Sequence, residues 1–143
     1  MAKKMRTETR RRSPAENDEL VFSALRKTDK PITAYELLDR LRIKGVSAPP
    51  TVYRSLDRLI EEGFAHKLES LNAFVACAHP HHRTSAIFAI CQDCGTASEF
   101  SDSSLARRIT AWAKKVRFEV DETIVEIRGH CGDCKGALRL ERS

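Results

Sequence analysis

The cysteines of this chain have a spacing that predicts metal chemistry. Two CxxC pairs, Cys91-Gln-Asp-Cys94 and Cys131-Gly-Asp-Cys134, each place two thiolates on one tight turn. Two such turns brought together form the closed tetrahedral site of four thiolates that structural zinc prefers. The alternatives are two disulfides, which a reducing cytosol disfavours, or a redox pair, which needs only one CxxC. We therefore predict a structural zinc site formed by Cys91, Cys94, Cys131 and Cys134.

A second group of candidate ligands surrounds Cys77, the fifth cysteine of the chain. The group consists of several histidines and one carboxylate: His66, His79, His81, His82 and Glu99. A single histidine is more often a surface or core residue than a ligand, but the cluster around an odd cysteine favours a site. A mixture of nitrogen, sulfur and oxygen ligands holds zinc less exclusively than four thiolates, which suits reversible sensing.

A third group of residues could contact nucleic acid from one helix. The segment 47–62 has an apolar stripe, and its opposite face carries Thr51, Arg54 and Arg58, with Tyr53 on the flank. Arginine reaches phosphates or guanine edges, and a tyrosine ring or a threonine methyl meets the methyl group of thymine. The alternative is an ordinary solvated helix, because three acidic residues share that surface: Asp57, Glu61 and Glu62.

The elements that must position these residues begin with three short helices. Capping boxes start the first two, at Ser13 and Thr33, and we expect the third to begin at Ser47 and to end at Gly63. Two extended runs follow, 64–69 and 73–77, joined by a three-residue turn, and together they predict a β-hairpin. Three helices and a hairpin form a winged helix.

The pattern then changes to that of a second, smaller domain. A strand is expected at 86–91, an amphipathic helix that includes Leu105, Ile109, Trp112 and Val116, and a strand at 123–128. We therefore predict an α+β chain with a winged-helix DNA-binding domain at 1–76 and a dimerisation and metal-binding domain at 77–143. Zinc binding should contribute to the folding of this second domain, whose own core is small.

Charge and composition exclude several classes of protein. The formal net charge of +5 lies in residues 1–12, which hold six Lys or Arg and one Glu. We expect a disordered basic arm there, either simply solvated or following DNA phosphates. There is no apolar run of the ~20 residues that a membrane helix needs, and no secretory signal, so we expect a cytoplasmic protein. No nucleophile and base form a recognisable pair, so we expect no enzyme.

The motifs together resemble the ferric uptake regulator family, and within it the zinc uptake regulator branch. The resemblance is carried by PPTVYRSLDRLIEEGFAHKLESLNAFVAC (49–77), CQDCG (91–95), SEF (98–100) and the final CGDC, and it covers about residues 32–134. It implies a homodimer that binds AT-rich palindromic DNA when loaded with metal and represses uptake genes. It also implies a sensing site formed by His66, Cys77, His82 and Glu99. Since the loop histidine of relatives tends to stand nearer the first CxxC, His81 or His79 could replace His82.

The sequence therefore favours a zinc-responsive repressor of zinc uptake genes, with two zinc ions per subunit and double-stranded DNA as its partner. An iron or peroxide sensor of the same fold is the nearest alternative, although the thiolate of Cys77 favours zinc. A zinc-ribbon accessory subunit of a nucleic-acid-processing enzyme is an alternative of another class. The three capped helices followed by a wing favour the repressor over that subunit.

Overall fold

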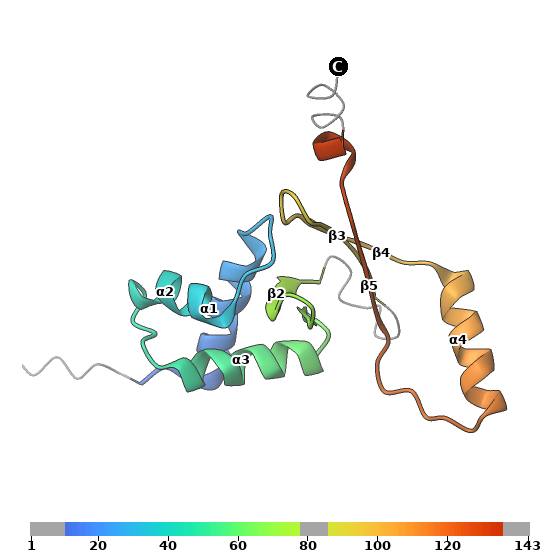
Figure 1. Ribbon diagram of the computed structural model, residues 1–143. Helices are drawn as coiled ribbons and strands as arrows, with labels where there is room; N and C mark the ends of the chain where they lie inside the picture. Colours follow the sequence, from blue (N-terminus) through green and yellow to red (C-terminus); the bar gives the residue numbers. More distant parts are fainter. Residues whose placement is uncertain (1–10, 78–85, 136–143) are drawn as a thin grey trace, which may run out of the picture.

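The chain folds into a helical unit with a β-hairpin, followed by a three-stranded sheet and a further helix (Figure 1). A computed structural model describes residues 11–77 and 86–135. Its elements in chain order are α1 (Pro14–Arg26), α2 (Ala34–Arg42), α3 (Pro49–Glu61), β1 (Ala65–Leu68), β2 (Ala73–Ala76), β3 (Ala86–Cys91), β4 (Ala97–Phe100), α4 (Ser103–Lys115) and β5 (Ile124–Gly129). The predicted α+β class is confirmed.

The first two helices start where their capping boxes predict. Ser13 accepts a hydrogen bond from the Glu16 amide, and Thr33 accepts one from the Glu36 amide, while each glutamate bonds back to the amide of its N-cap. These bonds satisfy amides that the first helical turn leaves without partners. The expected start of the third helix at Ser47 was too early. The N-cap of α3 is Ala48, whose side chain makes no capping bond.

The end of α3 directs the chain into the hairpin. Gly63 has a φ of +83°, in the left-handed region that glycine adopts without strain. Its amide bonds to the carbonyl of Ile60, and the Phe64 amide bonds to the carbonyl of Leu59 at 2.8 Å. This Schellman motif ends the helix at the predicted place. The hairpin, which we call the wing, then pairs β1 with β2 antiparallel, so that His66 lies opposite Val75.

The winged helix has one apolar core, built from one face of each helix and from the wing. Fully buried side chains from the helices include Val21, Leu37, Val52 and Leu56. Ile32, just before α2, exchanges two backbone hydrogen bonds with Phe74 of the wing, at 3.0 and 2.8 Å. The wing is therefore held to the helices by backbone pairing as well as by apolar packing.

The second sheet places β3 between the other two strands, antiparallel to β4 and parallel to β5. The strand β4 was not predicted from the sequence, and its burial alternates residue by residue. Leu68 and Val75 of the wing pack with Phe88 and Ile90 of β3 in a second apolar cluster. The wing therefore contributes side chains to both cores, across the expected domain boundary at 76.

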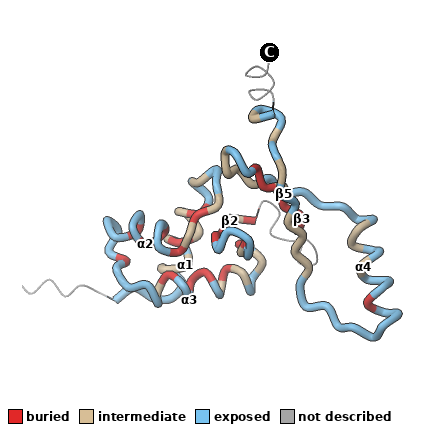
Figure 2. The backbone as a smooth tube through the Cα atoms, viewed as in Figure 1, coloured by how far each residue is buried: buried red, intermediate tan, exposed pale blue. Residues whose placement is uncertain are grey.

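The helix α4 connects β4 to β5 and is largely exposed (Figure 2). Its only buried side chain is that of Ala113. Large apolar side chains remain exposed on and after it, among them Trp112, Val116 and Phe118. Within residues 11–77 and 86–135, no helix has the length and apolar character required to cross a membrane.

Candidate metal centres and nucleic-acid interface

The four cysteines of the two CxxC pairs meet beyond the ends of two neighbouring strands. Because β3 and β5 run parallel, with Cys91 in register with Gly129, the turns that follow both strands emerge side by side. The sulfur atoms of Cys91, Cys94, Cys131 and Cys134 all lie within 4.8 Å of one another. The Sγ atoms of Cys94 and Cys131 are 3.8 Å apart, far beyond the ~2.05 Å of a disulfide bond. All four thiols are free, as a metal site requires.

Electrostatics at this cluster favour a bound cation. Hydrogen bonds from the amides of Cys94 and Cys131 lower the pKa of Cys91 to about 6. The neighbouring thiol of Cys131, together with burial, raises the pKa of Cys134 instead. Four adjacent thiols cannot all ionise without a positive charge among them. Zn²⁺ supplies that charge, and four thiolates are its usual ligands in closed sites, so the donor set fits zinc.

A polar contact ties the two cysteine turns together outside the sulfur cluster. Nδ1 of His130, which precedes Cys131, lies 2.6 Å from Oδ2 of Asp93 in the first turn. In the backbone, the amide of Gln92 also donates to the carbonyl of Gly129 at 2.8 Å. The turn that follows β3 and the segment that follows β5 are therefore held together by contacts besides those of the sulfur atoms.

The second candidate centre lies where the wing meets the second sheet. The ligand atoms of His66 on β1, Cys77 after β2 and Glu99 on β4 lie within 4.8 Å of one another. The Cys77 thiol donates to Oε1 of Glu99 at 3.4 Å, and Nε2 of His66 is 3.7 Å from the same oxygen. Residues from two strands and from the segment just after a third therefore converge on one point.

The His66 ring is the most informative group at this centre. It is 93% buried, since its exposed fraction is 7%, and neither ring nitrogen has a hydrogen-bond partner among the described residues. It makes a T-shaped contact with the ring of Phe88 of β3, with ring centroids 5.3 Å apart. A buried polar atom without a partner costs about 1–3 kcal/mol, and binding of a ring nitrogen to a metal ion would offset that cost. Imidazole, thiolate and carboxylate together fit zinc.

The loop histidines cannot be placed beside these three residues. His79, His81 and His82 lie outside the described residues. The structure thus brings together three of the four residues expected in the sensing site. Sequence reasoning did not identify Phe88, whose ring fixes the orientation of His66, because nothing in the residue type distinguishes it from other core side chains.

The exposed face of α3 presents some of the residues expected to contact DNA. Tyr53 is 41% exposed and Arg54 is exposed, while Thr51 is partly buried. The guanidinium of Arg58 faces inward and pairs with Asp18 of α1, with its Nη2 2.7 Å from Oδ1. The structure therefore presents Arg54 and Arg58 in different ways, although the sequence treats them alike.

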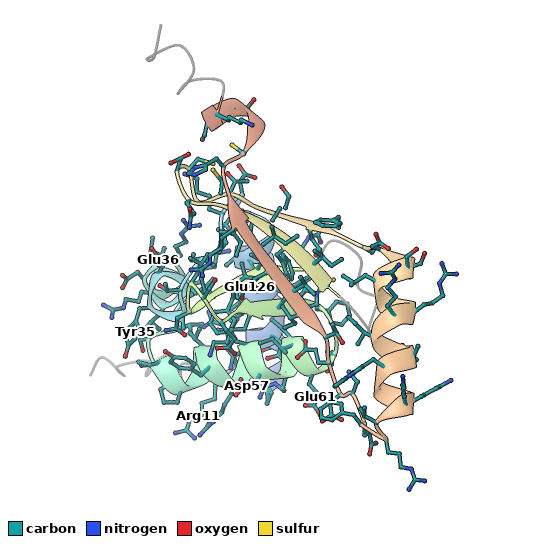
Figure 3. All side chains as sticks on the ribbon, turned by 45° about the vertical axis from the view of Figure 1, so that its right-hand side comes forward. Arg11, Tyr35, Glu36, Asp57, Glu61 and Glu126 are labelled. Carbon is teal, nitrogen blue, oxygen red and sulfur yellow. The ribbon has the colours of Figure 1, made fainter. Side chains whose placement is uncertain are left out.

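A basic groove lies at the beginning of α3. Its volume is about 830 Å³, and its lining residues include Arg11, Arg12, Ser47, Thr51 and Arg54. The guanidinium of Arg12 donates to the carbonyl of Lys44, which anchors the end of the basic arm at the α2–α3 connection. Arg11 projects on the same side of the winged helix as Asp57 of α3 (Figure 3). No acidic side chain is among the described residues that line the groove.

The amino-acid sequence of the chain matches the profile of one known family. The profile of the ferric uptake regulator family covers residues 15–128, most of the chain. The chain belongs to the ferric uptake regulator family.

Several relatives within this family are zinc regulators. The chain is 43% identical over 110 residues to the zinc uptake regulation protein of Escherichia coli (strain K12), covering 74% of this chain and 63% of that protein. It therefore spans less than two thirds of the length of this curated relative. The holo structure of XcZur aligns with a TM-score of 0.77 at 42% identity, with 84% of each chain covered. A zinc uptake regulator complexed with zinc and DNA aligns with a TM-score of 0.79 at 33% identity, covering 89% of this chain and 84% of that one. These similarities confirm the predicted resemblance to the zinc uptake regulator branch of the ferric uptake regulator family.

Proposed function

We propose that this chain is a zinc-responsive, DNA-binding repressor of zinc uptake genes, active as a zinc-loaded homodimer on AT-rich palindromic operators. The observation that carries the proposal is the buried His66 ring, which has no hydrogen-bond partner among the described residues and lies close to Cys77 and Glu99. The similarity to a zinc uptake regulator solved with zinc and DNA supports it. Each subunit would hold two zinc ions, one at the four cysteines and one at the junction.

The two centres would have different roles because their positions in the fold differ. The four cysteines join β3 to the segment that follows β5, all within the second domain. The junction centre joins the wing, through His66 and Cys77, to β4 of the second sheet, through Glu99. When bound, zinc supplies a positive centre that accepts lone pairs from all these ligands. The cysteine set would therefore stabilise one domain, and the junction set would restrict movement between two.

The fourth ligand of the junction would come from the loop that follows Cys77, and we propose His82 for it. With this ligand in place, His66 and Glu99 would hold the wing against the second sheet in a single orientation. A ligand that binds only one orientation shifts the population toward it. In a dimer, that orientation would fix the distance between the two α3 helices and match it to successive major grooves of DNA.

DNA contacts are proposed for the exposed start of α3 and the groove beside it. Tyr53 and Arg54 are exposed there, and Thr51 lines the groove together with Arg11 and Arg12. Pro49 and Pro50 occupy the first turn and have no amide hydrogen to offer a phosphate. Arg11 and Arg12 would therefore neutralise backbone phosphates, Arg54 would reach a phosphate or a guanine edge, and Thr51 and Tyr53 would contact base edges.

The second domain offers an apolar surface for a second copy of the chain. Trp112, Val116 and Phe118 are each more than half exposed, and the rings of Trp112 and Phe118 are 5.6 Å apart. A neighbouring cavity of about 340 Å³ is lined mainly by side chains of α4 and of the segment after it. Contiguous apolar surface of this kind is typical of protein–protein interfaces. Its position supports dimerisation through the second domain.

The test compares Cys77→Ser with the wild-type protein over a buffered zinc series. Zinc content is measured by native mass spectrometry, and DNA binding by fluorescence polarisation on an operator duplex selected from a random pool. We expect Cys77→Ser to keep one zinc per subunit and the dimer, but to lose zinc-dependent operator binding, because serine is a poor neutral ligand for zinc.

Cys94→Ser is the matched control, since it makes the same change at the other centre. It should lose the structural zinc and the stability of the second domain. If Cys77→Ser binds the operator at wild-type zinc concentrations, the junction is not the sensor. If the wild-type protein selects no duplex from the pool, the proposed repressor function is wrong.

A further inference from the structure

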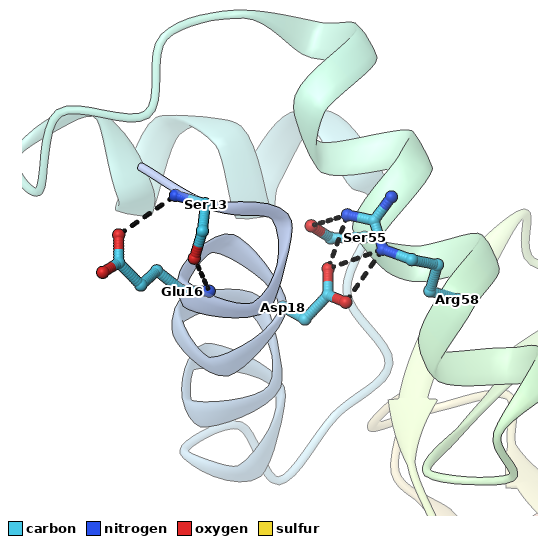
Figure 4. Close-up of polar contacts among 5 residues, drawn as sticks. All are labelled: Ser13, Glu16, Asp18, Ser55 and Arg58. Atoms are coloured by element: carbon cyan, nitrogen blue, oxygen red, sulfur yellow. Dashed lines mark hydrogen bonds and ion pairs between the residues drawn. The ribbon is translucent and has the colours of Figure 1, made fainter. Parts of the chain in front are cut away.

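A partly buried ion pair joins the first and third helices of the proposed DNA-binding domain (Figure 4). Both oxygens of Asp18 on α1 accept hydrogen bonds from Arg58 on α3: Oδ2 from Nε at 2.8 Å, and Oδ1 from Nη2 at 2.7 Å. Nη2 also lies 3.4 Å from Oγ of the fully buried Ser55. The Arg58 side chain is 36% exposed and that of Asp18 is 19% exposed. Two parallel bonds to a carboxylate are the strongest arrangement that a guanidinium makes with one partner.

The pair lies beside the proposed DNA-contacting surface. Thr51, Arg54 and Arg58 are spaced by three and four residues along α3, so they follow one face of the helix. Arg54 makes no hydrogen bond or ion pair with any described residue. Arg58, one turn further along, is engaged by Asp18 although part of its surface remains accessible. The two arginines on this helix face therefore differ: Arg58 is paired with a carboxylate, and Arg54 has no such partner among the described residues.

The partner of Arg58 determines how many phosphates the helix can neutralise. A phosphate oxygen and the Asp18 carboxylate would compete for the same donors of the guanidinium. To capture Arg58, DNA would have to break two charge-assisted hydrogen bonds that already exist. Each arginine that neutralises a phosphate raises the affinity for every sequence alike, because phosphates carry no sequence information.

We propose that Asp18 withholds Arg58 from the DNA backbone, so that α3 offers one uncommitted arginine and binds non-specific DNA less tightly. Asp18 is then a specificity-determining residue that acts through Arg58. This inference rests on the proposed DNA-binding function. It assigns Arg58 to the ion pair with Asp18 rather than to the set of DNA contacts expected from the sequence.

The experiment uses the zinc-loaded protein and a duplex of scrambled sequence, so that no operator is needed. The dissociation constant is measured over a salt series for the wild-type protein, Asp18→Asn, and the double variant Asp18→Asn with Arg58→Gln. We expect Asp18→Asn to steepen the slope of log K against log salt by about 0.9 for each subunit bound, as one more phosphate is neutralised. The double variant should return to the wild-type slope, because no arginine is left to be released.

Glu19→Gln is the matched control, since Glu19 is an exposed carboxylate beside Asp18 on the same helix. It removes the same charge without releasing an arginine and should leave the slope unchanged. A steeper slope that persists in the double variant would assign the effect to lost negative charge and overturn the proposal. An unchanged slope in Asp18→Asn would overturn it too, as would a shallower slope in Arg58→Gln alone.

Folding of each variant is checked by zinc content and circular dichroism. If Asp18→Asn fails to fold, the salt dependence of Arg58→Gln decides. A slope shallower than that of the wild-type protein would show that Arg58 already contacts a phosphate, and would overturn the proposal. A slope equal to that of the wild-type protein supports it. Failure of the proposed function looks different from all these outcomes. In that case the wild-type protein would bind no duplex at any salt concentration.

Discussion

At the scale of single residues, the neighbours of a side chain decide its chemistry. His66 and His130 are both imidazoles, yet the first is buried without a hydrogen-bond partner among the described residues and the second is half-exposed beside Asp93. Arg54 and Arg58 differ in the same way, because only the second faces a carboxylate. Residue type defines what each group can do, and its surroundings select which of these possibilities is available.

Arg54 should be essential for operator binding. Its guanidinium is exposed and lines the basic groove, so Arg54→Ala removes a DNA contact without opening the core. We expect a loss of about 1–3 kcal/mol in operator binding if it contacts a base bidentately, with zinc content unchanged. Polarisation titrations on the operator provide the measurement, and Arg40→Ala on α2 is the control. Wild-type affinity in Arg54→Ala would place the DNA-reading surface elsewhere.

The Asp18–Arg58 pair should also make stability depend on pH. Burial opposes ionisation of Asp18, but hydrogen bonds from Arg58 and Ser55 and the charge of Arg58 outweigh it and lower its pKa. A carboxyl whose pKa is lowered in the folded state contributes stability above its unfolded pKa. That contribution is lost as pH falls through the folded value, which lies below the ordinary 3.8. The melting temperatures of wild-type and Asp18→Asn should therefore differ at pH 6 and converge toward pH 3. A constant difference would contradict this assignment.

At the scale of elements, the wing joins the three helices to the second sheet. Its residues alternate between two apolar clusters: Ala65 and Phe74 pack with the helices, and Leu68 and Val75 pack with the second sheet. Successive side chains of a strand point to opposite faces, so a two-stranded hairpin can serve two cores at once. His66 lies two residues before Leu68 and therefore shares its face. The apolar packing of the wing thus supports the position of a proposed zinc ligand.

Leu68→Ala should weaken zinc binding at the junction more than at the cysteines. Leu68 is fully buried, and its truncation should cost about 2–5 kcal/mol of stability. Because His66 would lose the support of the same strand face, we expect the apparent affinity of the junction zinc to fall while the structural zinc is retained. Competition with a chromogenic chelator measures both sites. Leu71→Ala is the control, since Leu71 lies in the wing turn and is 41% exposed. Equal effects of the two variants would show that the packing of Leu68 does not support the site.

At the scale of the whole molecule, the basic groove and the exposed pair of rings after β4 belong to different parts of the described chain. The groove, with Arg11 and Arg12, belongs to the proposed DNA-binding domain, and the exposed rings of Trp112 and Phe118 belong to the proposed second domain. This separation suits a dimer that binds its second copy through one end and DNA through the other. It also explains why the net charge alone was a weak guide to function, since +5 is the excess of one short segment.

Deletion of residues 2–12 should weaken binding to all DNA sequences alike. The deleted segment carries six Lys or Arg, and Arg12 lies at its junction with the fold. We expect a shallower salt dependence and an unchanged preference for the operator over scrambled DNA, because phosphate contacts carry no sequence information. A second variant replaces Lys3, Lys4, Arg6 and Arg10 by Gln and keeps Arg11 and Arg12, which separates the arm from the groove. An identical salt slope in the wild-type protein and both variants would show that the arm does not contact DNA.

The sequence alone determined those features that depend on close neighbours in the chain. The capping boxes at Ser13 and Thr33 and the two CxxC turns involve residues three apart, so their spacing is sufficient to predict them. The resemblance to the zinc uptake regulator branch of the ferric uptake regulator family also rested on motifs of neighbouring residues.

Only the tertiary structure showed how distant residues meet, and it revealed contacts that neither the motifs nor the resemblance implied. Arg58 and Asp18 are 40 positions apart, and their pairing depends on how α1 packs against α3. The wing was predicted as a hairpin, but its packing against the second sheet could not be predicted. Apolar residues in a strand do not reveal which surface they will cover. Glu99 reaches His66 because the unpredicted strand β4 pairs with β3, which places Glu99 beside Phe88 and under the wing. Such contacts arise from the packing of whole elements, which residue spacing does not encode.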